Sequence, residues 1–430
     1  MKYYSLNNHN EIVDFRLATI QGQASDKGLF FPECIPQLSA SFINDLKSLN
    51  VVDMGVSVMK PYVGTAMPDH VLQNIIEETL SFPIPLKGIH KDIFSLELFH
   101  GPTLAFKDVG ARFMSRCLGY FLQNETKKVT VLVATSGDTG GAVANGFYDV
   151  DGIDVVILYP KGRVSPVQEK QLTTLGKNIT ALEVEGSFDD CQQMVKQAFL
   201  DTDIKKKRML SSANSINVAR WLPQQLYYFM AYQQWQENVP PTVCVPSGNF
   251  GNICAGLLAK VSGLPLGHFI AACNINDIVS EYLSSGNIKA KNTSATLSNA
   301  MDVGNPSNLV RVLQLFQNKF DTIKSNISSD TITDEVTLDT IQKVYKTYHY
   351  LLDPHGAVAY KALETYLSRN KNQKGFIVET AHPIKFPDAV KAAIGLDLEV
   401  PESLKELMQQ EKKSIEIKNT FSDLKDFLML

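Results

Sequence analysis

One lysine, Lys107, stands where a strand-like run is followed by a helical pattern. The run covers residues 95–99, and the helix, with Val109 and Phe113 on its apolar side, begins at residues 106–108. A cation in the first helical turn interacts unfavourably with the helix macrodipole, so helix formation alone does not explain a lysine at this position. The flanking residues are apolar, and an amine kept from water has a lowered pKa and attacks carbonyl groups. Lys107 is therefore either a solvated surface lysine or a Schiff-base nucleophile.

Three later turns concentrate small residues directly after apolar strands. The first, residues 134–142, reads ATSGDTGGA. Its glycines allow close backbone approach, and Ser136, Asp138 and Thr139 supply polar side chains beside the free N–H groups of the next helix. An anion or another polar ligand could bind there. Taken alone, this turn and the two that follow could each be an ordinary connection between a strand and a helix.

The second turn, residues 245–252, reads VPSGNFGN and leads into a helix. The free N–H groups of a glycine-rich turn at a helix N-terminus bind anions and suit a phosphate best. The turn is not a nucleotide-binding P-loop, because no Gly-Lys-Ser/Thr follows. The residues of this turn alone therefore indicate a generic phosphate site.

The third turn, residues 378–383, places Thr380 and an imidazole after the last apolar run. Ligands of open α/β sheets bind at the carboxyl ends of the strands, so the three turns together favour one shared site. A fourth polar cluster holds Asn214, Ser215 and Arg220 ahead of an apolar helix. Its composition suits a phosphate or a carboxylate, although these residues could also be a helix cap and a surface charge.

The elements that must position these turns are strands alternating with helices. From residue 93 onward, apolar β-branched runs recur, each followed by a turn and a helical pattern. This alternation predicts an α/β fold with open, mostly parallel sheets covered by helices on both faces. Ser187, followed by an aspartate at the third position, predicts the start of one of these helices. The strand-like runs cover residues 129–134, 154–159, 179–185, 242–245, 269–273 and 375–378.

A chain of 430 residues exceeds what one core usually organises, so several domains are expected. Residues 1–92 read as an N-terminal cap domain, in which Phe30 and Phe31 look exposed within a loop. Residues 93–134 and 223–430 form the expected large domain, which ends in a solvated helical tail. A small α/β domain, residues 135–222, is expected between its two parts.

The composition is that of an ordinary soluble protein, with 44% hydrophobic residues and a net charge of −4. The only dense basic cluster is residues 205–208, so nucleic acid is an unlikely partner. The six cysteines show no metal-ligand spacing and look reduced, and we expect no bound metal. Neither a signal peptide nor a membrane-spanning stretch is found, which favours the cytoplasm.

The motifs together resemble the fold-type-II enzymes that depend on pyridoxal 5′-phosphate, the class of the tryptophan synthase β-like fold. Within this class the chain is similar to the threonine synthase family from end to end. The segments that carry the resemblance are YYSLNNHNE, GLFFP, LFHGPTLAFKD, ATSGDTG, SANSIN, PSGNFG, LSNAMDV, DPHGAVAY and TAHP.

The resemblance implies how the large domain would bind the cofactor. Lys107 would hold pyridoxal 5′-phosphate as a Schiff base and then move protons. Thr380 would face the pyridine nitrogen. The cofactor phosphate would be bound by the backbone N–H groups of Gly248, Asn249, Phe250, Gly251 and Asn252. Asp138 would lie near the 3′-oxygen, where many relatives have an asparagine; a carboxylate cannot donate there unless protonated. The roles of His100, Asp108 and His382 stay open.

The resemblance also implies a substrate, O-phospho-L-homoserine. The enzyme would be a carbon–oxygen lyase that eliminates phosphate by β,γ-elimination and adds water at Cβ, giving L-threonine in the last step of threonine biosynthesis. Ser136 and Thr139 would hold the substrate carboxylate. Asn214, Ser215 and Arg220 would recognise its phosphate.

Two alternatives stay open, and so does the assembly. A phospholyase on the same scaffold would eliminate phosphate without adding water and would release a keto acid. A catalytically idle homologue would only bind phosphate or a partner, although the retention of Lys107 counts against it. The partner is a small molecule and not a membrane, and the chain is a monomer or a homodimer.

Overall fold

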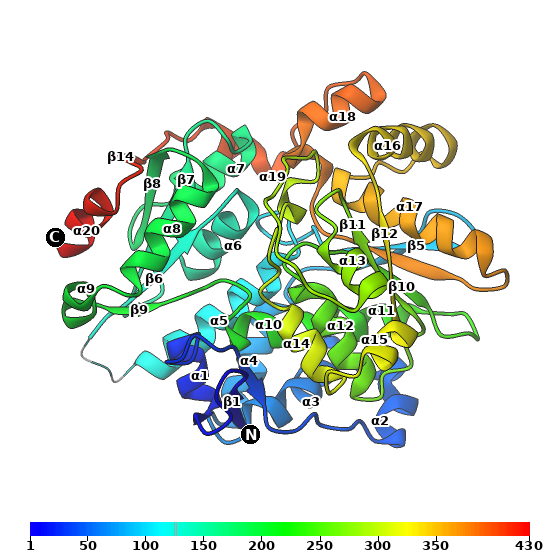
Figure 1. Cartoon of the computed structure of the whole chain (residues 1–430), viewed down its shortest axis with the longest axis horizontal. Helices are drawn as coiled ribbons and strands as arrows, with labels where there is room; N and C mark the ends of the chain where they lie inside the picture. Colours follow the sequence, from blue (N-terminus) through cyan, green and yellow to red (C-terminus); the bar gives the residue numbers. More distant parts are fainter. Residues whose placement is uncertain (124, 126) are drawn as a thin grey trace.

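A computed structural model describes residues 1–123, 125 and 127–430 of the chain. Three sheets organise the described residues, two of them large and mostly parallel and one small and antiparallel (Figure 1). Helices cover the faces of the two large sheets, which lie side by side, while the N-terminal segment packs below them in the view of Figure 1. The predicted α/β class is confirmed.

The larger sheet has six strands in the order β12-β11-β10-β13-β5-β4. All neighbours are parallel except β4 and β5, which pair antiparallel. Parallel neighbours place the carboxyl ends of β5, β10 and β13 at one edge, where the turns that follow them meet. The strands are β4 (Leu86–Gly88), β5 (Ile93–Glu97), β10 (Thr242–Pro246), β11 (Phe269–Cys273), β12 (Ile327–Thr331) and β13 (Gly375–Glu379).

The second sheet has five parallel strands in the order β14-β8-β7-β6-β9. The expected domain border after Ala134 does not follow this sheet, because β6 pairs with β7 along its whole length. We propose instead that the smaller unit begins near residue 128 and includes the end of the chain. The strands are β6 (Val129–Ala134), β7 (Ile153–Pro160), β8 (Ile179–Glu185), β9 (Met209–Ser211) and β14 (Ile415–Lys418).

The C-terminal tail differs from the expected solvated helix of the large domain. It forms α19 (Glu402–Gln409), then β14, which extends the smaller sheet, and finally α20 (Phe421–Met429). Leu424 and Leu428 are buried against the core of that sheet. The Lys- and Glu-rich sequence of the tail did not indicate that these two leucines are buried, because only one face of a short helix is apolar.

The N-terminal segment contains the small antiparallel sheet β2-β1-β3, built from Lys2–Ser5, Ile12–Asp14 and Phe30–Pro32. Phe30 and Phe31 were expected to be exposed, but they are 0% and 4% exposed. Phe31 stacks on Trp221 with ring centroids 5.8 Å apart, so this segment packs onto the helices that surround the site. Its helices are α1 (Phe15–Gln21), α2 (Ala40–Asp45), α3 (Val51–Val63) and α4 (Asp69–Thr79).

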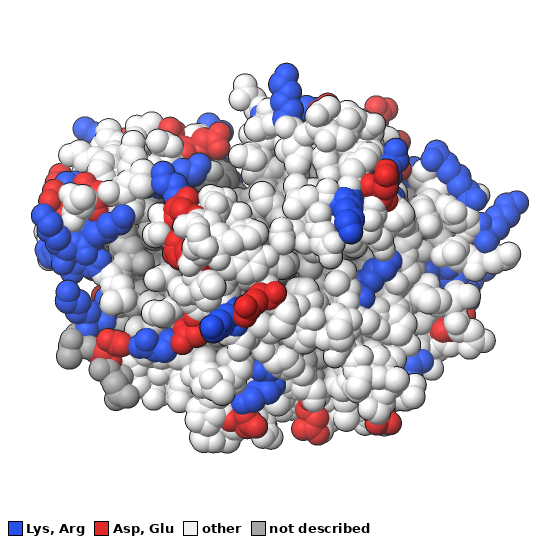
Figure 2. Space-filling model, turned by 60° about the horizontal axis from the view of Figure 1, so that its bottom comes forward, with Lys and Arg blue, Asp and Glu red and all other residues white. Residues whose placement is uncertain are grey.

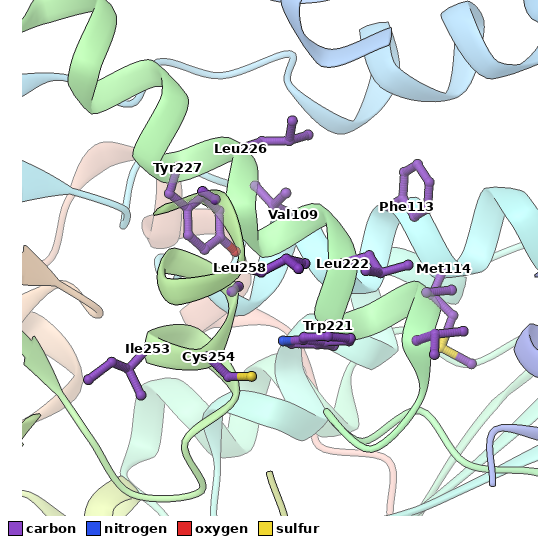
Figure 3. Packing of buried hydrophobic residues seen from close by; sticks show 14 of the residues in the cluster. Val109, Phe113, Met114, Trp221, Leu222, Leu226, Tyr227, Ile253, Cys254 and Leu258 are labelled. Carbon is purple, nitrogen blue, oxygen red and sulfur yellow. The ribbon is translucent and has the colours of Figure 1, made fainter. Parts of the chain in front are cut away.

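The core beneath the site is formed by helices from distant parts of the sequence. Figure 3 shows Val109 and Phe113 of α5 close to Trp221 and Leu222, with residues of α12 beside them. The apolar face predicted for the helix after Lys107 is therefore the face that packs inward. The helices are α5 (Lys107–Leu122), α10 (Val218–Trp221), α11 (Leu226–Gln234) and α12 (Gly251–Val261).

The remaining helices cover the two large sheets. The predicted helix start at Ser187 is confirmed, since its side chain caps α8 in a capping box with Asp190. These helices are α6 (Asp138–Phe147), α7 (Pro166–Thr173), α8 (Phe188–Ala198), α9 (Thr202–Lys207), α13 (Ile278–Ser285), α14 (Leu309–Leu315), α15 (Phe320–Asn326), α16 (Asp334–Tyr348), α17 (Pro354–Arg369) and α18 (Pro387–Ile394).

The surface carries charges of both signs. On the face drawn in Figure 2, acidic and basic side chains alternate across the middle, and the densest basic group lies at the left edge. Acidic groups of α9 and its N-cap pair with Lys425, which approaches Asp201 at 2.8 Å and Asp203 at 2.9 Å. Within residues 1–123, 125 and 127–430, no helix combines the length and the apolar character needed to cross a bilayer.

Candidate active site

The side chain of Lys107 is largely buried at the N-terminus of α5. Lys107 is the first residue of α5, its side chain is 16% exposed, and its Nζ is 3.8 Å from Oδ2 of Asp138. Burial lowers the pKa of Lys107; Lys385 and Arg220 lower it further, against the opposing effect of Asp138. An amine in this setting is a better nucleophile than a surface lysine.

The loop before Lys107 is fixed by its own side chains and by the strand end that carries Thr380. Asp108 accepts hydrogen bonds from the backbone N–H of Thr103, at 2.9 Å, and from its hydroxyl, which gives Asp108 a role in shaping the loop. Phe106 N–H donates to the carbonyl of Thr380 at 2.9 Å, next to a β-bridge between residues 105 and 381. The structure thus brings the lysine and the third turn together.

Thr380 is 6% exposed, and its hydroxyl makes no hydrogen bond within the described part of the chain. His382, two residues later, accepts a hydrogen bond from the N–H of Ile384 at 3.1 Å and so begins a short 3-10 turn. Burial lowers the pKa of His382, which favours its neutral form. The hydroxyl of Thr380 is the group of this turn that is available to a ligand.

Asp138 is the first residue of α6 and contacts two residues that the sequence did not single out. Lys385 Nζ lies 2.7 Å from its Oδ1, and Gln168 Nε2 donates to the same oxygen at 2.9 Å. Burial alone would raise the pKa of Asp138, but Lys385 and Lys107 lower it well below its usual range. Asp138 is therefore an ionised carboxylate. A lysine between apolar neighbours after a strand end was the signal that could have indicated Lys385.

Thr135 fixes the conformation of the turn before α6. Its hydroxyl accepts hydrogen bonds from the N–H groups of Gly137, at 3.0 Å, and Gly140, at 2.9 Å. Gly137 has φ +139°, and a Cβ there would lie 2.5 Å from the amide carbon of Gln168. Ser136 and Thr139 lie on this turn with partly exposed side chains. Their hydroxyls can face a ligand carboxylate.

The second turn, ahead of α12, presents unpaired backbone donors. Phe250 adopts the left-handed conformation with φ 63°. The five N–H groups from Gly248 to Asn252 find no acceptor within residues 1–123, 125 and 127–430. Asn252 anchors the turn by donating to the carbonyl of Pro246 at 2.9 Å. Clustered N–H groups at a helix N-terminus attract a phosphate.

Ser215 lies against this same turn. Its Oγ accepts hydrogen bonds from Asn249 and from Asn308, each at 3.0 Å, and it lies 3.4 Å from the position of a Cβ built on Gly251. With both acceptor positions used, the hydroxyl still has its proton to donate. Asn214, the preceding residue, is partly exposed. The structure therefore places Ser215 beside the α12 N-terminus, whereas the sequence had grouped it with Arg220.

Arg220 is 3% exposed and makes no ion pair with the residues that the structure describes. One terminal nitrogen donates to the carbonyl of Ala213 at 2.7 Å, while its Nε is buried without a partner. Burial lowers the pKa of Arg220 to about 10, so it stays charged at neutral pH. A buried guanidinium with free donors is suited to an anionic ligand.

A second buried arginine, Arg311, was missed by the sequence reading. It is 0% exposed, lies 4.4 Å from the centre of the Trp221 ring and donates only to uncharged acceptors. Burial lowers the pKa of Arg311 to about 9. Its five hydrogen bonds reach the carbonyls of Phe30, Ser215 and Ile216 and the side chain of Asn308. Arg311 thus ties the N-terminal segment to the segment of Ser215, whose side chain contacts the turn before α12.

A buried acidic group lies behind Thr380. Glu379 is 0% exposed and accepts from the N–H of Asp353 at 2.9 Å. Burial, together with Asp353, raises the pKa of Glu379 well above its usual value. His100, whose role was open, contacts Glu97 at 2.7 Å.

The residues present fit pyridoxal phosphate. A phosphate group suits the unpaired N–H groups before α12, a carbonyl suits the amine of Lys107, and a ring nitrogen suits the free hydroxyl of Thr380. These three groups follow β10, β5 and β13, whose carboxyl ends share one edge of the sheet.

Comparison with known proteins shows the family to which the chain belongs. The family model described as "Pyridoxal-phosphate dependent enzyme" matches residues 82–380. The models "Threonine synthase N terminus" and "Threonine synthase, C-terminal" match residues 2–80 and 356–428. The threonine synthase of Haemophilus influenzae is 44% identical over 434 residues, with all of both chains covered.

Solved structures give the same result. The crystal structure of threonine synthase from Escherichia coli superposes with a TM-score of 0.93 at 43% identity, covering 100% of this chain and 99% of that one. The PLP-bound threonine synthase from Brucella melitensis gives 0.92 at 36% identity, covering 100% and 98%.

The fold and the site therefore define a pyridoxal-phosphate-dependent enzyme of fold type II. Its cofactor is pyridoxal phosphate, as the resemblance of the motifs implied. Within that class, the chain belongs to the threonine synthase family.

Proposed function

We propose that the enzyme converts O-phospho-L-homoserine and water into L-threonine and phosphate. The observation that carries this proposal is Arg220, a buried guanidinium with unpaired donors and no carboxylate partner within the described residues. It lies next to α5, since a Cβ on Gly110 would be 3.1 Å from its Nε, one helical turn after Lys107. An anion-recognising group thus stands close to the reactive amine, as a phosphorylated amino acid requires.

The side chains divide the work as follows. Arg220 binds the substrate phosphate, with Asn214 beside it. Ser136 and Thr139 hold the substrate carboxylate at the α6 N-terminus, where the helix dipole favours an anion. Ser215 donates instead to the cofactor phosphate, together with the N–H groups from Gly248 to Asn252.

Lys107 would hold the cofactor, and its free amine would move protons at Cα and Cβ of the substrate. Bound pyridoxal phosphate supplies the electron withdrawal that no side chain provides. The hydroxyl of Thr380 would face the ring nitrogen and would leave it unprotonated. Asp138 keeps a negative charge 3.8 Å from the Lys107 amine.

The proposal is tested by Arg220→Met and Arg220→Lys in the holoenzyme. Phosphate release and threonine formation are measured together, because a phospholyase would release phosphate without threonine. We expect kcat/KM for O-phospho-L-homoserine to fall by about 10²-fold or more in Arg220→Met, since a hydrogen bond to a charged group contributes about 1.5–3 kcal/mol. Arg220→Lys restores little, because an ammonium is not bidentate. Equal losses of cofactor affinity and substrate use would contradict the role of Arg220.

We also propose that the enzyme acts in the cytoplasm as a monomer or a homodimer on a small molecule. All six cysteines are free, and five of them are buried, which suits a reducing compartment. Light scattering on the eluted holoenzyme measures the assembly, and a mass above two chains contradicts this part.

A further inference from the structure

Lys385 is a fully buried lysine at the centre of the site. It ends the 3-10 turn from Pro383 to Lys385, and its side chain is 0% exposed. Its Nζ lies 2.7 Å from Oδ1 of Asp138 and donates to the carbonyl of Thr103 at 2.8 Å. An ammonium has three donors, and these two contacts fix its position.

The other oxygen of the same carboxylate faces Lys107. Oδ2 of Asp138 is 3.8 Å from the Lys107 amine, so two lysines share one acid in a site nearly closed to water. The charged groups that face Lys107 from the surrounding elements are Asp138, Lys385, Arg220 and Asp353. A buried charge is costly unless it is paired, and one carboxylate neutralises one ammonium.

The two distances show which lysine forms the ion pair with Asp138. Lys385 is in direct contact with the carboxylate, whereas Lys107 stands more than 1 Å further away. A second cation beside an amine disfavours its protonation, which is one of the ways in which proteins activate lysines. The pKa of Lys107 is lowered by burial and by Lys385, which agrees with this effect of a second cation.

We propose that Lys385 is a positioning residue that occupies Asp138 and thereby keeps the amine of Lys107 uncharged and reactive. Lys385 acts through Asp138 and not on the substrate. The idea rests on the proposed function only in taking Lys107 as the reactive amine.

The test compares Lys385→Met, which removes the charge, with Lys385→Arg, which keeps it. Lys391→Met is the matched control, because Lys391 follows six residues later, is 58% exposed and pairs only with the exposed Asp397 among the described residues. Near-ultraviolet circular dichroism of each holoenzyme establishes that it is folded. The double variant Asp138→Asn with Lys385→Met removes both charges, so that no unpaired carboxylate is left buried.

The first measurement is a pH titration of the cofactor absorption in the holoenzyme, which follows the protonation of the Lys107 nitrogen. We expect the midpoint of Lys385→Met to rise by about one pH unit or more, a tenfold change in the unprotonated fraction. Lys391→Met should match the unmodified enzyme, Lys385→Arg should stay close to it, and the double variant should return toward it. An unchanged or lowered midpoint in Lys385→Met would overturn the proposal.

The second measurement uses the full chain after removal of the cofactor. Trinitrobenzenesulfonate labels only uncharged amines, and peptide mass spectrometry gives the rate at Lys107. Labelling at pH 8 should be about tenfold slower in Lys385→Met than in Lys391→Met, following the same shift. Equal rates would also overturn the proposal. Neither measurement involves the substrate, so a failure of the proposed substrate would leave this comparison intact.

Discussion

Gly110 offers a direct way to disturb the contact between α5 and Arg220. A Cβ at this position would lie 2.7 Å from the carbonyl oxygen of Arg220 and 3.1 Å from its Nε. Ordinary contact begins near 3.4 Å, so Gly110→Ala must push the arginine and the helix apart by about 0.7 Å. The backbone atom cannot rotate away, and α10 must move.

The cost follows from two opposing effects. Overpacking of this kind costs about 1–3 kcal/mol, while alanine gains about 1 kcal/mol over glycine in a helix. We expect the free energy of unfolding to fall by about 1 kcal/mol. A displacement approaching 1 Å reduces catalysis by up to about 10²-fold, so kcat/KM for O-phospho-L-homoserine should fall about 10- to 100-fold.

Gly119→Ala is the matched control, because it makes the same change on the same helix. Its Cβ would meet only one side-chain atom of Val150, at 3.1 Å. Urea unfolding and steady-state kinetics of both holoenzymes supply the comparison. The reasoning is refuted if Gly110→Ala is folded and has the kcat/KM of Gly119→Ala.

Two further variants test buried groups around the site. Arg311→Met leaves the carbonyls of Phe30, Ser215 and Ile216 unpaired. At about 1–3 kcal/mol for each buried acceptor, we expect the free energy of unfolding in urea to fall by about 3 kcal/mol or more; a smaller loss than 1 kcal/mol would contradict this. Glu379 has a raised pKa in the folded state, so its stabilisation is complete below its unfolded pKa and is lost as pH rises toward its folded value. Glu379→Gln should therefore gain stability relative to the unmodified enzyme between pH 5 and pH 8, and parallel pH profiles would refute the assignment.

The sequence predicted the parts of the fold that local pattern determines. The helix start at Lys107, the cap at Ser187 and most of the longer parallel strands were found, because apolar periodicity and capping act over a few residues. The strands that were missed are short ones, such as β9 and β14, and the polar strand β12, whose sequence is ISSDT. A run of three or four residues has too few positions to show alternation, and it becomes a strand only when a neighbour pairs with it.

The site was predicted less completely, for a physical reason. Residues in glycine-rich turns can be recognised from the sequence, whereas Lys385 and Arg311 are single basic residues in short helices. What gives each its importance is burial and a partner far away in the chain, Asp138 for one and Phe30 for the other. Phe31 was misplaced in the same way, since Trp221 covers it and no local pattern shows this.

The strand order of the larger sheet has a consequence for the order in which the protein can be assembled. β13 lies between β10 and β5, yet it is the last of the six strands in the chain. A growing chain that has not reached residue 375 therefore holds two half-sheets with open inner edges, which are prone to pair wrongly. The same late segment carries Thr380 and the hydrogen bond to Phe106, beside Lys107. Nearly nine-tenths of the chain must therefore be synthesised before this hydrogen bond can fix the loop that precedes Lys107. The surroundings of the reactive amine are thus completed late in synthesis.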